Sequence, residues 1–287
     1  MGDSSTRRMF LAALAAAPAL SQSPKLTAGA VIDLIKDNVG VPWAAETVDR
    51  IIAGSAETPV TGVATTMMAT LDVVRRAAAE GKNLVITHEP TFYSHQDATD
   101  KLGDDPVYRD KVKILQDNRM VVFRFHDHWH RRRPDGIAYG MTRELGWEAY
   151  SQDQRRFELP ATTLGALARH VETKLKASTV RVVGDAALPV RRVRANWGYL
   201  SQERGIAALA DSETDVLLCG ESREWEAVEY AVDAVAAGRK KGLIVIGHVA
   251  SEQAGMKYCA EWLRTFLGDL PVGLVATREP FWSPESA

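Results

Sequence analysis

Six of the seven histidines in this 287-residue chain fall into three short clusters, and each cluster also carries a carboxylate. The clusters are His88 with Glu89 and His95; His126 with Asp127, His128 and His130; and His248 with Glu252. Imidazole and carboxylate groups together are typical ligands of zinc, iron and manganese. The clusters therefore predict a metal site that is assembled from distant parts of the chain.

Each cluster directly follows an apolar run that is typical of a buried strand, at residues 83–87, 120–125 and 242–246. Further strands are predicted at 59–65, 179–183, 190–195, 215–219 and 272–276, and a turn at 184–189 favours a hairpin. Helices are predicted at 27–38, 44–53, 67–80, 105–118, 134–145, 162–176, 202–210, 223–237 and 251–267. Thr27, Asp105 and Ser251 are the expected N-caps of three of them. This alternation of strands and helices indicates an α/β fold.

Both halves of the chain show the alternation, which predicts two α/β lobes with mixed sheets flanked by helices. Such folds place their sites at strand ends, so we expect the metal site between the lobes at strand ends. The N-terminal lobe is expected to span residues 27–148, followed by a middle part at 149–240. Residues 241–280 are expected to form a strand–helix–strand unit that packs back on the N-terminal lobe and completes the site.

The composition narrows the class of protein. The chain is 46% hydrophobic and 25% charged, as in a soluble globular protein. Its net charge of -2 and pI of about 6.4 argue against a nucleic-acid partner. The run Arg131 to Arg133 is interpreted either as a solvated loop or as a positive rim for an anionic substrate. Cys219 and Cys259 do not have the spacing of a metal-binding pair.

The N-terminus has the pattern of an export signal. Arg7 and Arg8 precede a short, alanine-rich apolar stretch that ends in small residues. The arginine pair indicates the twin-arginine route, so residues 1–22 are predicted to be a signal peptide of a periplasmic or secreted protein. The alternative is a mature N-terminal helix. No later segment has the roughly 18 apolar residues of a membrane span, so no membrane partner is expected after signal removal.

Two local geometries are open for the second cluster. If the strand continues, His126, His128 and His130 point to one face. If the chain turns after His126, His130 returns beside it, and Asp127 can hydrogen-bond a ligand imidazole. His95 is expected in a surface loop.

The other two clusters also leave alternatives. An extended chain points His88 and Glu89 in opposite directions, so one cation would rarely use both as ligands, whereas two neighbouring cations could use one each. Glu252, predicted in the first turn of a helix, either interacts only with the helix dipole or binds metal together with His248. The pair His88–Glu89 is the first indication of a dinuclear site.

The order of these motifs resembles the NIF-three-like dinuclear-metal-centre family, which includes GTP cyclohydrolase I type 2 homologues. Members carry an Ile-Thr-His-His-Pro type motif after an early strand, His-x-x-x-Asp after a central strand, and Gly-His-x-x-x-Glu at a C-terminal helix. The corresponding segments here are 86–90, 126–130 and 247–252. The resemblance spans residues 27–280, and the order and spacing of the motifs carry it.

The resemblance implies two divalent ions, zinc, iron or manganese, held by His88, Glu89, His126, His130, His248 and Glu252. Glu89 stands where the family usually has histidine, and His130 where it usually has aspartate. Our hypothesis is that a carboxylate has changed places, which preserves the charge around two metals. The competing hypothesis is that one metal site is lost. Asp127 is also close enough in sequence to take the place of the missing aspartate. Where the family tends to have a turn rich in glycine and serine, this chain has Trp197 and Tyr199.

The function implied is that of an exported, dinuclear metal-dependent hydrolase acting on an unknown small molecule through a metal-activated water. Glu252 is expected to bridge the metals, Glu221 to accept a proton and Asp127 to orient a ligand. The resemblance also implies a homohexamer. The alternatives are a non-catalytic, metal-binding toroidal scaffold and a GTP cyclohydrolase-like ring-opening hydrolase.

Overall fold

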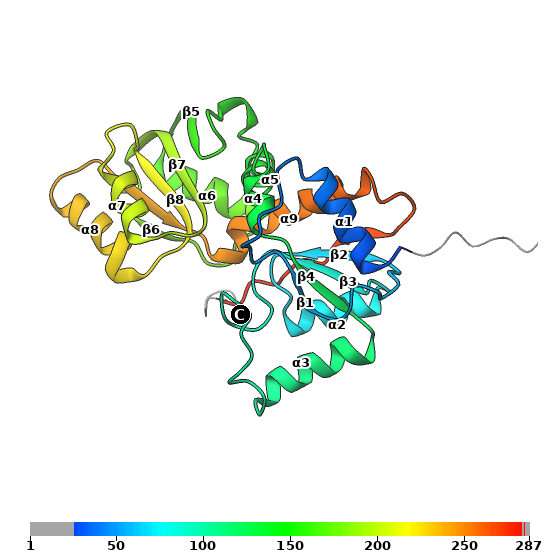
Figure 1. The fold of residues 1–287 in the computed structure, drawn as a ribbon. Helices are drawn as coiled ribbons and strands as arrows, with labels where there is room; N and C mark the ends of the chain where they lie inside the picture. The colour runs from blue at the N-terminus through cyan, green and yellow to red at the C-terminus, as the bar shows by residue number, and fades with distance from the viewer. Residues whose placement is uncertain (1–25, 283, 285–287) are drawn as a thin grey trace, which may run out of the picture.

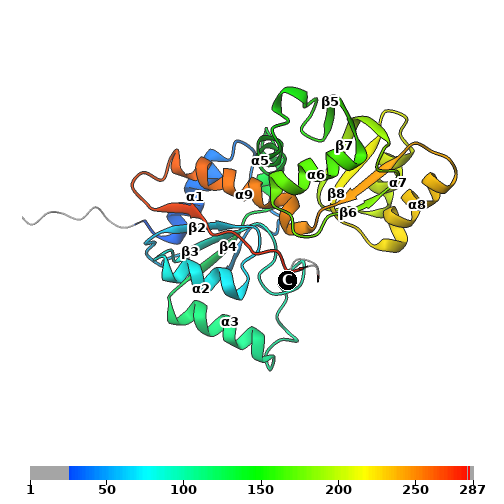
Figure 2. The same cartoon turned by 180° about the vertical axis from the view of Figure 1, so that it is seen from behind.

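The computed structural model describes residues 26–282 and 284, and it contains two five-stranded mixed sheets flanked by helices. Figures 1 and 2 show the sheets in separate lobes, with α4 (Asp127–Arg131), α5 (Gly136–Leu145) and α9 (His248–Arg264) between them. The predicted fold class is confirmed. The predicted signal peptide at 1–22 lies outside the described residues.

The first sheet has the order β1 (Ile51–Ala53), β4 (Val121–Arg124), β3 (Leu84–Thr87), β2 (Val63–Thr66) and β10 (Val272–Leu274). All neighbours are parallel except β1, which pairs antiparallel with β4. Side chains alternate between the two faces. One face packs against α1 (Ala28–Asn38) and α9, and the other against α2 (Leu71–Ala79) and α3 (Pro106–Asp117). Thr27 and Asp105 cap α1 and α3 as predicted.

The second sheet has the order β5 (Arg156–Thr163), β7 (Pro189–Tyr199), β8 (Val216–Glu221), β9 (Gly242–Val245) and β6 (Arg181–Val183). Strands β7, β8 and β9 are parallel, and the two edge strands are antiparallel to their neighbours. One face packs on α6 (Leu164–Leu175), and the other packs on α7 (Gln202–Ala210) and α8 (Glu229–Ala236). A π-helical turn, η2 (Glu224–Val228), precedes α8. A short 3-10 turn, η1 (Glu148–Tyr150), precedes β5.

The two lobes share one continuous apolar core, because α5 and α9 pack against each other between the sheets. The helices approach closely at Gly140, where an added Cβ would lie 2.5 Å from the carbonyl oxygen of Ala254. Of residues 241–280, β9 lies in the second sheet and β10 in the first, with α9 joining them. Within the described residues, no helix has the length and apolarity of a membrane span.

The helix predicted at 44–53 is wrong, because long-range contacts take up its backbone. The amide of Ala44 donates to His128 Nε2 (2.9 Å), and Ile51–Ala53 forms the edge strand β1 beside β4. The hairpin predicted across 184–189 is also wrong, since β6 pairs with β9 at one edge while β7 pairs with β5 and β8. Local sequence signals do not report such non-local pairing.

Candidate metal centre

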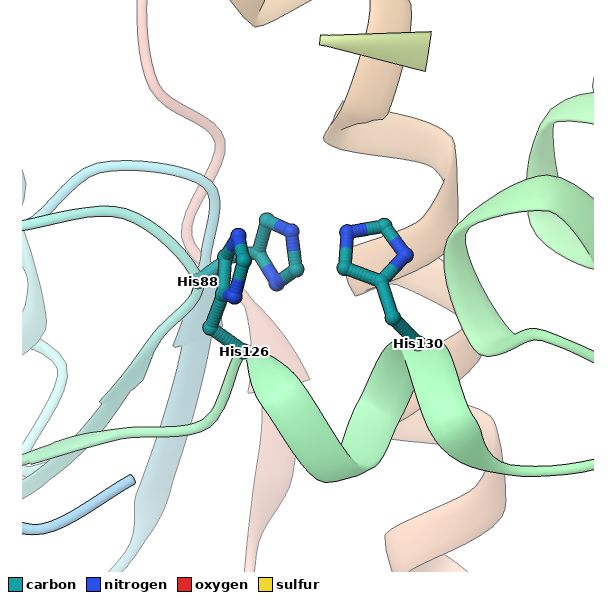
Figure 3. A group of neighbouring side chains, drawn as sticks. All are labelled: His88, His126 and His130. Carbon is teal, nitrogen blue, oxygen red and sulfur yellow. The ribbon is translucent and has the colours of Figure 1, made fainter. Parts of the chain in front are cut away.

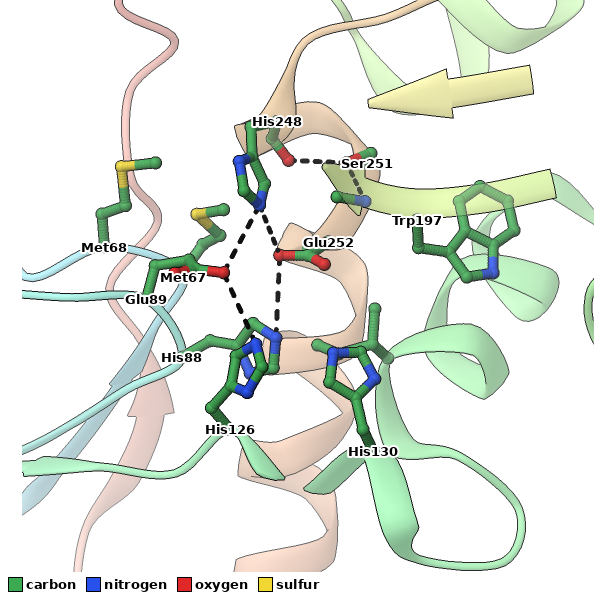
Figure 4. A network of polar contacts seen from close by, with 12 residues as sticks. Met67, Met68, His88, Glu89, His126, His130, Trp197, His248, Ser251 and Glu252 are labelled. Atoms are coloured by element: carbon green, nitrogen blue, oxygen red, sulfur yellow. Dashed lines mark hydrogen bonds and ion pairs between the residues drawn. The ribbon is translucent and has the colours of Figure 1, made fainter. Parts of the chain in front are cut away.

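The carboxyl ends of parallel strands from both sheets face each other, and six polar side chains meet there. His88 follows β3, His126 follows β4, and His248 follows β9. Figure 3 shows the imidazoles of His88, His126 and His130 close together, and Figure 4 adds His248, with the Glu89 and Glu252 carboxylates between the rings. The structure thus brings together every residue that the sequence proposed as a metal ligand.

The chain turns after His126 into the short helix α4, which places His126 and His130 one turn apart on the same side. Their ring centroids are 5.0 Å apart. The ring centroid of His88 lies 4.5 Å from that of His126 and 4.9 Å from that of His130. One ring nitrogen from each of the three lies within 4.8 Å of the others. This spacing is compatible with one shared cation.

His128 points away from the centre into the core of the first lobe. Its Nδ1 donates to Asp49 (2.6 Å), and its ring stacks on Trp43 at a centroid distance of 3.7 Å. The Asp49 carboxylate also accepts from the backbone amides of His126, Asp127 and His128 at 2.7–2.9 Å. Asp49 therefore fixes the turn that brings His126 and His130 together.

Helix α9 begins at His248 rather than after Ser251, so the predicted cap at Ser251 is wrong. Gly247, with φ 86°, precedes the helix, and the Ser251 hydroxyl instead accepts from the amide of Gly198 (3.0 Å). The earlier start places His248 and Glu252 one turn apart, with Nε2 and Oε2 separated by 3.2 Å. Glu252 Oε2 is also 3.6 Å from His88 Nε2, so it lies between two imidazoles.

Glu89 reaches the centre from the first lobe. Its Oε1 lies 3.4 Å from His248 Nε2 and 3.7 Å from His126 Nε2, and its Oε2 lies 3.5 Å from the guanidinium of Arg124. Arg124 is fully buried and also donates to the His95 carbonyl. Burial opposes ionisation of Glu89, but the His248 hydrogen bond and neighbouring positive charges lower its pKa to about 2. Glu89 is therefore an anion in the site.

Each of the four imidazoles is held from outside by its other nitrogen, Nδ1. His88 Nδ1 faces the Phe125 carbonyl at 3.2 Å, His126 Nδ1 faces Asp127 at 3.0 Å, His130 Nδ1 faces Asp135 at 3.2 Å, and His248 Nδ1 faces Glu221 at 3.2 Å. An acceptor on Nδ1 favours a proton there and turns Nε2 toward the centre. Metal-binding histidines in proteins show this same arrangement.

The inner atoms of the site suit a cation. His88 Nε2 is buried and has no hydrogen-bond partner among the described residues. Burial and the neighbouring imidazoles hold the pKa of His88 well below its usual range, so this nitrogen carries a free lone pair. Burial also opposes protonation of His248, but Glu221, Glu252 and Glu89 raise its pKa to about 12. In the metal-free protein, a proton thus offsets negative charge that a cation would offset when bound.

The other predicted site residues lie around this centre in different ways. Asp127 holds His126, as predicted for an orienting group, and Glu221 holds His248 from the end of β8. The anion-binding interpretation of Arg131 to Arg133 does not fit, because none of them lines the cavity beside the centre. Arg132 instead stacks on the rings of Trp129, Tyr258 and Trp262.

That cavity has a volume of about 830 Å³ and opens between the lobes. His95, Trp197 and Tyr199 line it, and so do three basic residues from separate elements, Lys111, Arg155 and Arg204. Sequence reasoning missed these basic residues because they are isolated along the chain. The cavity places a positively charged wall beside the imidazole and carboxylate cluster.

Asp135 was also missed, because the helix predicted at 134–145 included it, whereas α5 begins at Gly136 with Asp135 as its N-cap. Its carboxylate caps α5 through the amides of Ile137 (3.0 Å) and Ala138 (3.1 Å) and also faces His130 and Arg155. Burial opposes protonation of His130, but the Asp135 hydrogen bond and charge raise its pKa. Asp135 therefore couples the helix cap to the orientation of His130.

Replacing Asp135 with asparagine is expected to weaken zinc binding by about 10–100-fold, the usual effect of losing a partner behind a ligand histidine. Asparagine is as good an N-cap as aspartate, so the free energy of unfolding of the metal-free protein should change little. Competition with a zinc-binding dye measures the affinity. Asp105→Asn, at the cap of the distant α3, is the control and should bind zinc like wild type. Equal affinity in both variants would remove Asp135 from the site.

Comparisons with known proteins identify the family and the fold. The sequence matches the family model described as Duf34/NIF3 (NGG1p interacting factor 3) over residues 31–279. A Bacillus cereus protein related to NIF3 has a similar fold, with a TM-score of 0.70 and 16% identity over 90% of this chain and 99% of that chain. A hypothetical protein of Staphylococcus aureus has a TM-score of 0.68 and 19% identity over 90% of this chain and 99% of that chain. Reduced HcgD from Methanocaldococcus jannaschii has a TM-score of 0.62 and 17% identity over 87% of this chain and 97% of that chain. No curated protein matches the sequence.

Proposed function

The chain belongs to the Duf34/NIF3 family, and we propose that it binds two divalent cations, zinc, iron or manganese, in the cluster between its lobes. Family membership confirms the resemblance that the motif order indicated. The cation ligands in this proposal are His88, Glu89, His126, His130, His248 and Glu252.

The observation that carries the proposal is the shared orientation of the four imidazoles, each fixed at Nδ1 and turned inward at Nε2. An uncharged cavity or a simple ion-pair network does not require this orientation. Two ions are favoured over one because Glu89 and Glu252 each lie between two imidazoles, where a carboxylate can bind two cations at once. The six donors also exceed the four that a tetrahedral zinc site uses.

We further propose that the protein is a metal-dependent hydrolase. Two cations held by these residues would lower the pKa of water and polarise a substrate oxygen, which is the chemistry that hydrolysis needs. The protein's own part is to orient the ligands through Asp127, Asp135 and Glu221 and to offer a cavity of about 830 Å³ for a small substrate. Glu221 is half-exposed at the cavity wall, where it can accept a proton from the substrate side.

A substrate screen tests the hydrolase proposal. Metal-loaded protein should hydrolyse at least one class among generic phosphoesters, amides and nucleotides, and the rate should vanish on chelation and return with added metal. Ring opening of GTP belongs in the same screen. If fully metal-loaded protein turns over none of these classes, the non-catalytic alternative, a metal-binding scaffold, replaces the hydrolase.

Two further proposals rest on the sequence and the family. We propose export through the twin-arginine route, supported by the Arg7–Arg8 pair ahead of an apolar stretch. Fusion of residues 1–30 to a reporter that is active only after export tests this, with Arg7→Lys/Arg8→Lys as the control that should stay inside the cell. We also propose a homohexamer, and light scattering on the purified protein should then give about six times the 31.5 kDa chain mass, less any cleaved signal.

A further inference from the structure

Two buried polar groups in the cavity wall have hydrogen-bonding capacity that the protein does not use. The Thr91 side chain is 1% exposed, and its hydroxyl has no hydrogen-bond partner in the part of the chain that the structure describes. Lys111, on α3, is 3% exposed, and its ammonium donates to the carbonyl oxygen of Thr91 at 2.7 Å. Both residues line the cavity beside the metal centre.

The Lys111 ammonium is a cation without a counter-ion. It forms no ion pair with any carboxylate of the described residues, and its other neighbours are the ring faces of Tyr93 and Phe92, at 5.2 Å and 5.8 Å. A buried charge is costly unless it is paired and hydrogen-bonded. Burial accordingly lowers the pKa of Lys111 to about 8, although the charge of Asp97 acts in the opposite direction.

Asp97 forms no ion pair with Lys111 within the described residues. Its Oδ1 accepts from the backbone amides of Thr91 (2.6 Å) and Phe92 (2.8 Å), and its Oδ2, which has no hydrogen-bond partner there, lies 3.6 Å from the Arg124 guanidinium. These contacts hold the loop after β3 in a shape in which Tyr93 has a φ of 63°, an unfavourable value for a bulky residue. The loop thus brings the Thr91 carbonyl to the Lys111 ammonium. Within the described residues the Thr91 hydroxyl has no hydrogen-bond partner and the Lys111 charge has no ion pair.

We propose that Thr91 and Lys111 form a subsite for an oxyanion, a carboxylate or phosphate group, of the molecule on which the metal centre acts. The link to that molecule rests on the proposed function, whereas the subsite itself does not. An oxyanion accepts hydrogen bonds from the Thr91 hydroxyl and from the free hydrogens of the Lys111 ammonium. It also supplies the negative charge that would pair with the Lys111 cation. Arg204, on the other lobe, lines the same cavity and adds to its positive potential, whereas Arg155, which also lines it, is paired with Asp135 at 3.0 Å.

Anion titration of the metal-free protein tests the subsite, because no bound cation can then attract the anion. Inorganic phosphate and acetate are titrated separately by calorimetry into wild type, Lys111→Met, Thr91→Val and Lys113→Met. Lys113 is the control, since it is on the same helix but exposed and paired with Asp117. Methionine and valine fill similar volumes without the polar group, and Thr91→Val provides the result if Lys111→Met does not fold.

We expect saturable binding of one of the two anions to wild type and Lys113→Met with equal affinity. Binding should be at least tenfold weaker in Lys111→Met and several-fold weaker in Thr91→Val. Tighter binding of phosphate than of acetate assigns the subsite to a phosphorylated molecule, and the reverse order assigns it to a carboxylate. Absence of saturable binding, or equal affinity in all four proteins, overturns the subsite. The metal content of each variant, measured separately, should match wild type, so a failure here leaves the metal centre standing.

Discussion

Replacing Glu252 with glutamine is expected to weaken divalent-cation binding by more than about 100-fold. This loss is larger than the roughly 10–100-fold loss on removing a group that hydrogen-bonds a ligand histidine. Glu252 is 2% exposed, and its carboxylate lies 3.2 Å from His248 Nε2 and 3.6 Å from His88 Nε2. Glutamine has nearly the same shape, so the packing of α9 is retained. The change removes the negative charge and one cation-binding oxygen at the point where the two lobes meet.

Calorimetric titration with zinc, after removal of endogenous metal, measures this effect. Glu261→Gln is the control, because Glu261 is on the same helix but pairs with Arg143 near the surface. Hydrolytic activity, where found, should disappear with the metal in Glu252→Gln and remain in the control. Wild-type zinc affinity in folded Glu252→Gln would exclude Glu252 as a ligand.

Replacing Gly198 with alanine is expected to cost both stability and metal. Gly198 has a φ of +73°, and an added Cβ would lie 2.3 Å from Glu252 Oε1 and 3.0 Å from His248 Nε2. A side chain in this backbone region costs about 1–3 kcal/mol, and the methyl group must also displace two proposed ligands, Glu252 and His248. We therefore expect a lower free energy of unfolding together with at least tenfold weaker cation binding.

Gly146 separates these two effects. It has nearly the same φ, +72°, but no atom lies within 4 Å of its added Cβ. Gly146→Ala should lose stability to a similar extent and bind zinc like wild type, as thermal unfolding and zinc titration on both variants will show. If Gly198→Ala keeps wild-type affinity, then the space at Gly198 does not matter to the cluster.

The approximate location of the centre could be predicted because it depends on local signals. Short apolar runs marked β3, β4 and β9, and each was followed directly by a histidine. The carboxyl ends of parallel strands share one edge of a sheet, which brings His88 and His126 together at the end of the first sheet. His248 follows a strand of the second sheet, so its approach depends on the expectation that the site lies between the two lobes. The motif order then added Glu89, His130 and Glu252 to the set.

The parts that sequence could not predict depend on contacts between distant residues. The turn after His126 is fixed by Asp49, which lies 77 residues away from it along the chain. The start of α9 at His248 is set by the path out of β9 through Gly247, whereas the cap rule favoured Ser251. The ion-pair partner of Glu89 is Arg124, a buried arginine at the end of β4. Nothing in the sequence distinguishes Arg124 from other strand residues.

The two substitutions relative to the usual family pattern also become interpretable with these partners. Glu89 gains a buried cation in Arg124, and His130 gains a buried anion in Asp135. Each changed ligand is thus paired with a group of opposite charge behind it. This pairing supports an exchange of a carboxylate and an imidazole between two positions more than the loss of one metal site.

The number of metal ions per chain tests the central claim most directly. Protein purified from its native host without chelators is analysed by elemental mass spectrometry against amino-acid analysis, with Glu252→Gln measured in parallel. About two zinc, iron or manganese ions per wild-type chain are expected, with a clear loss in the variant. About one ion per wild-type chain would contradict the dinuclear centre, and none would contradict metal binding altogether.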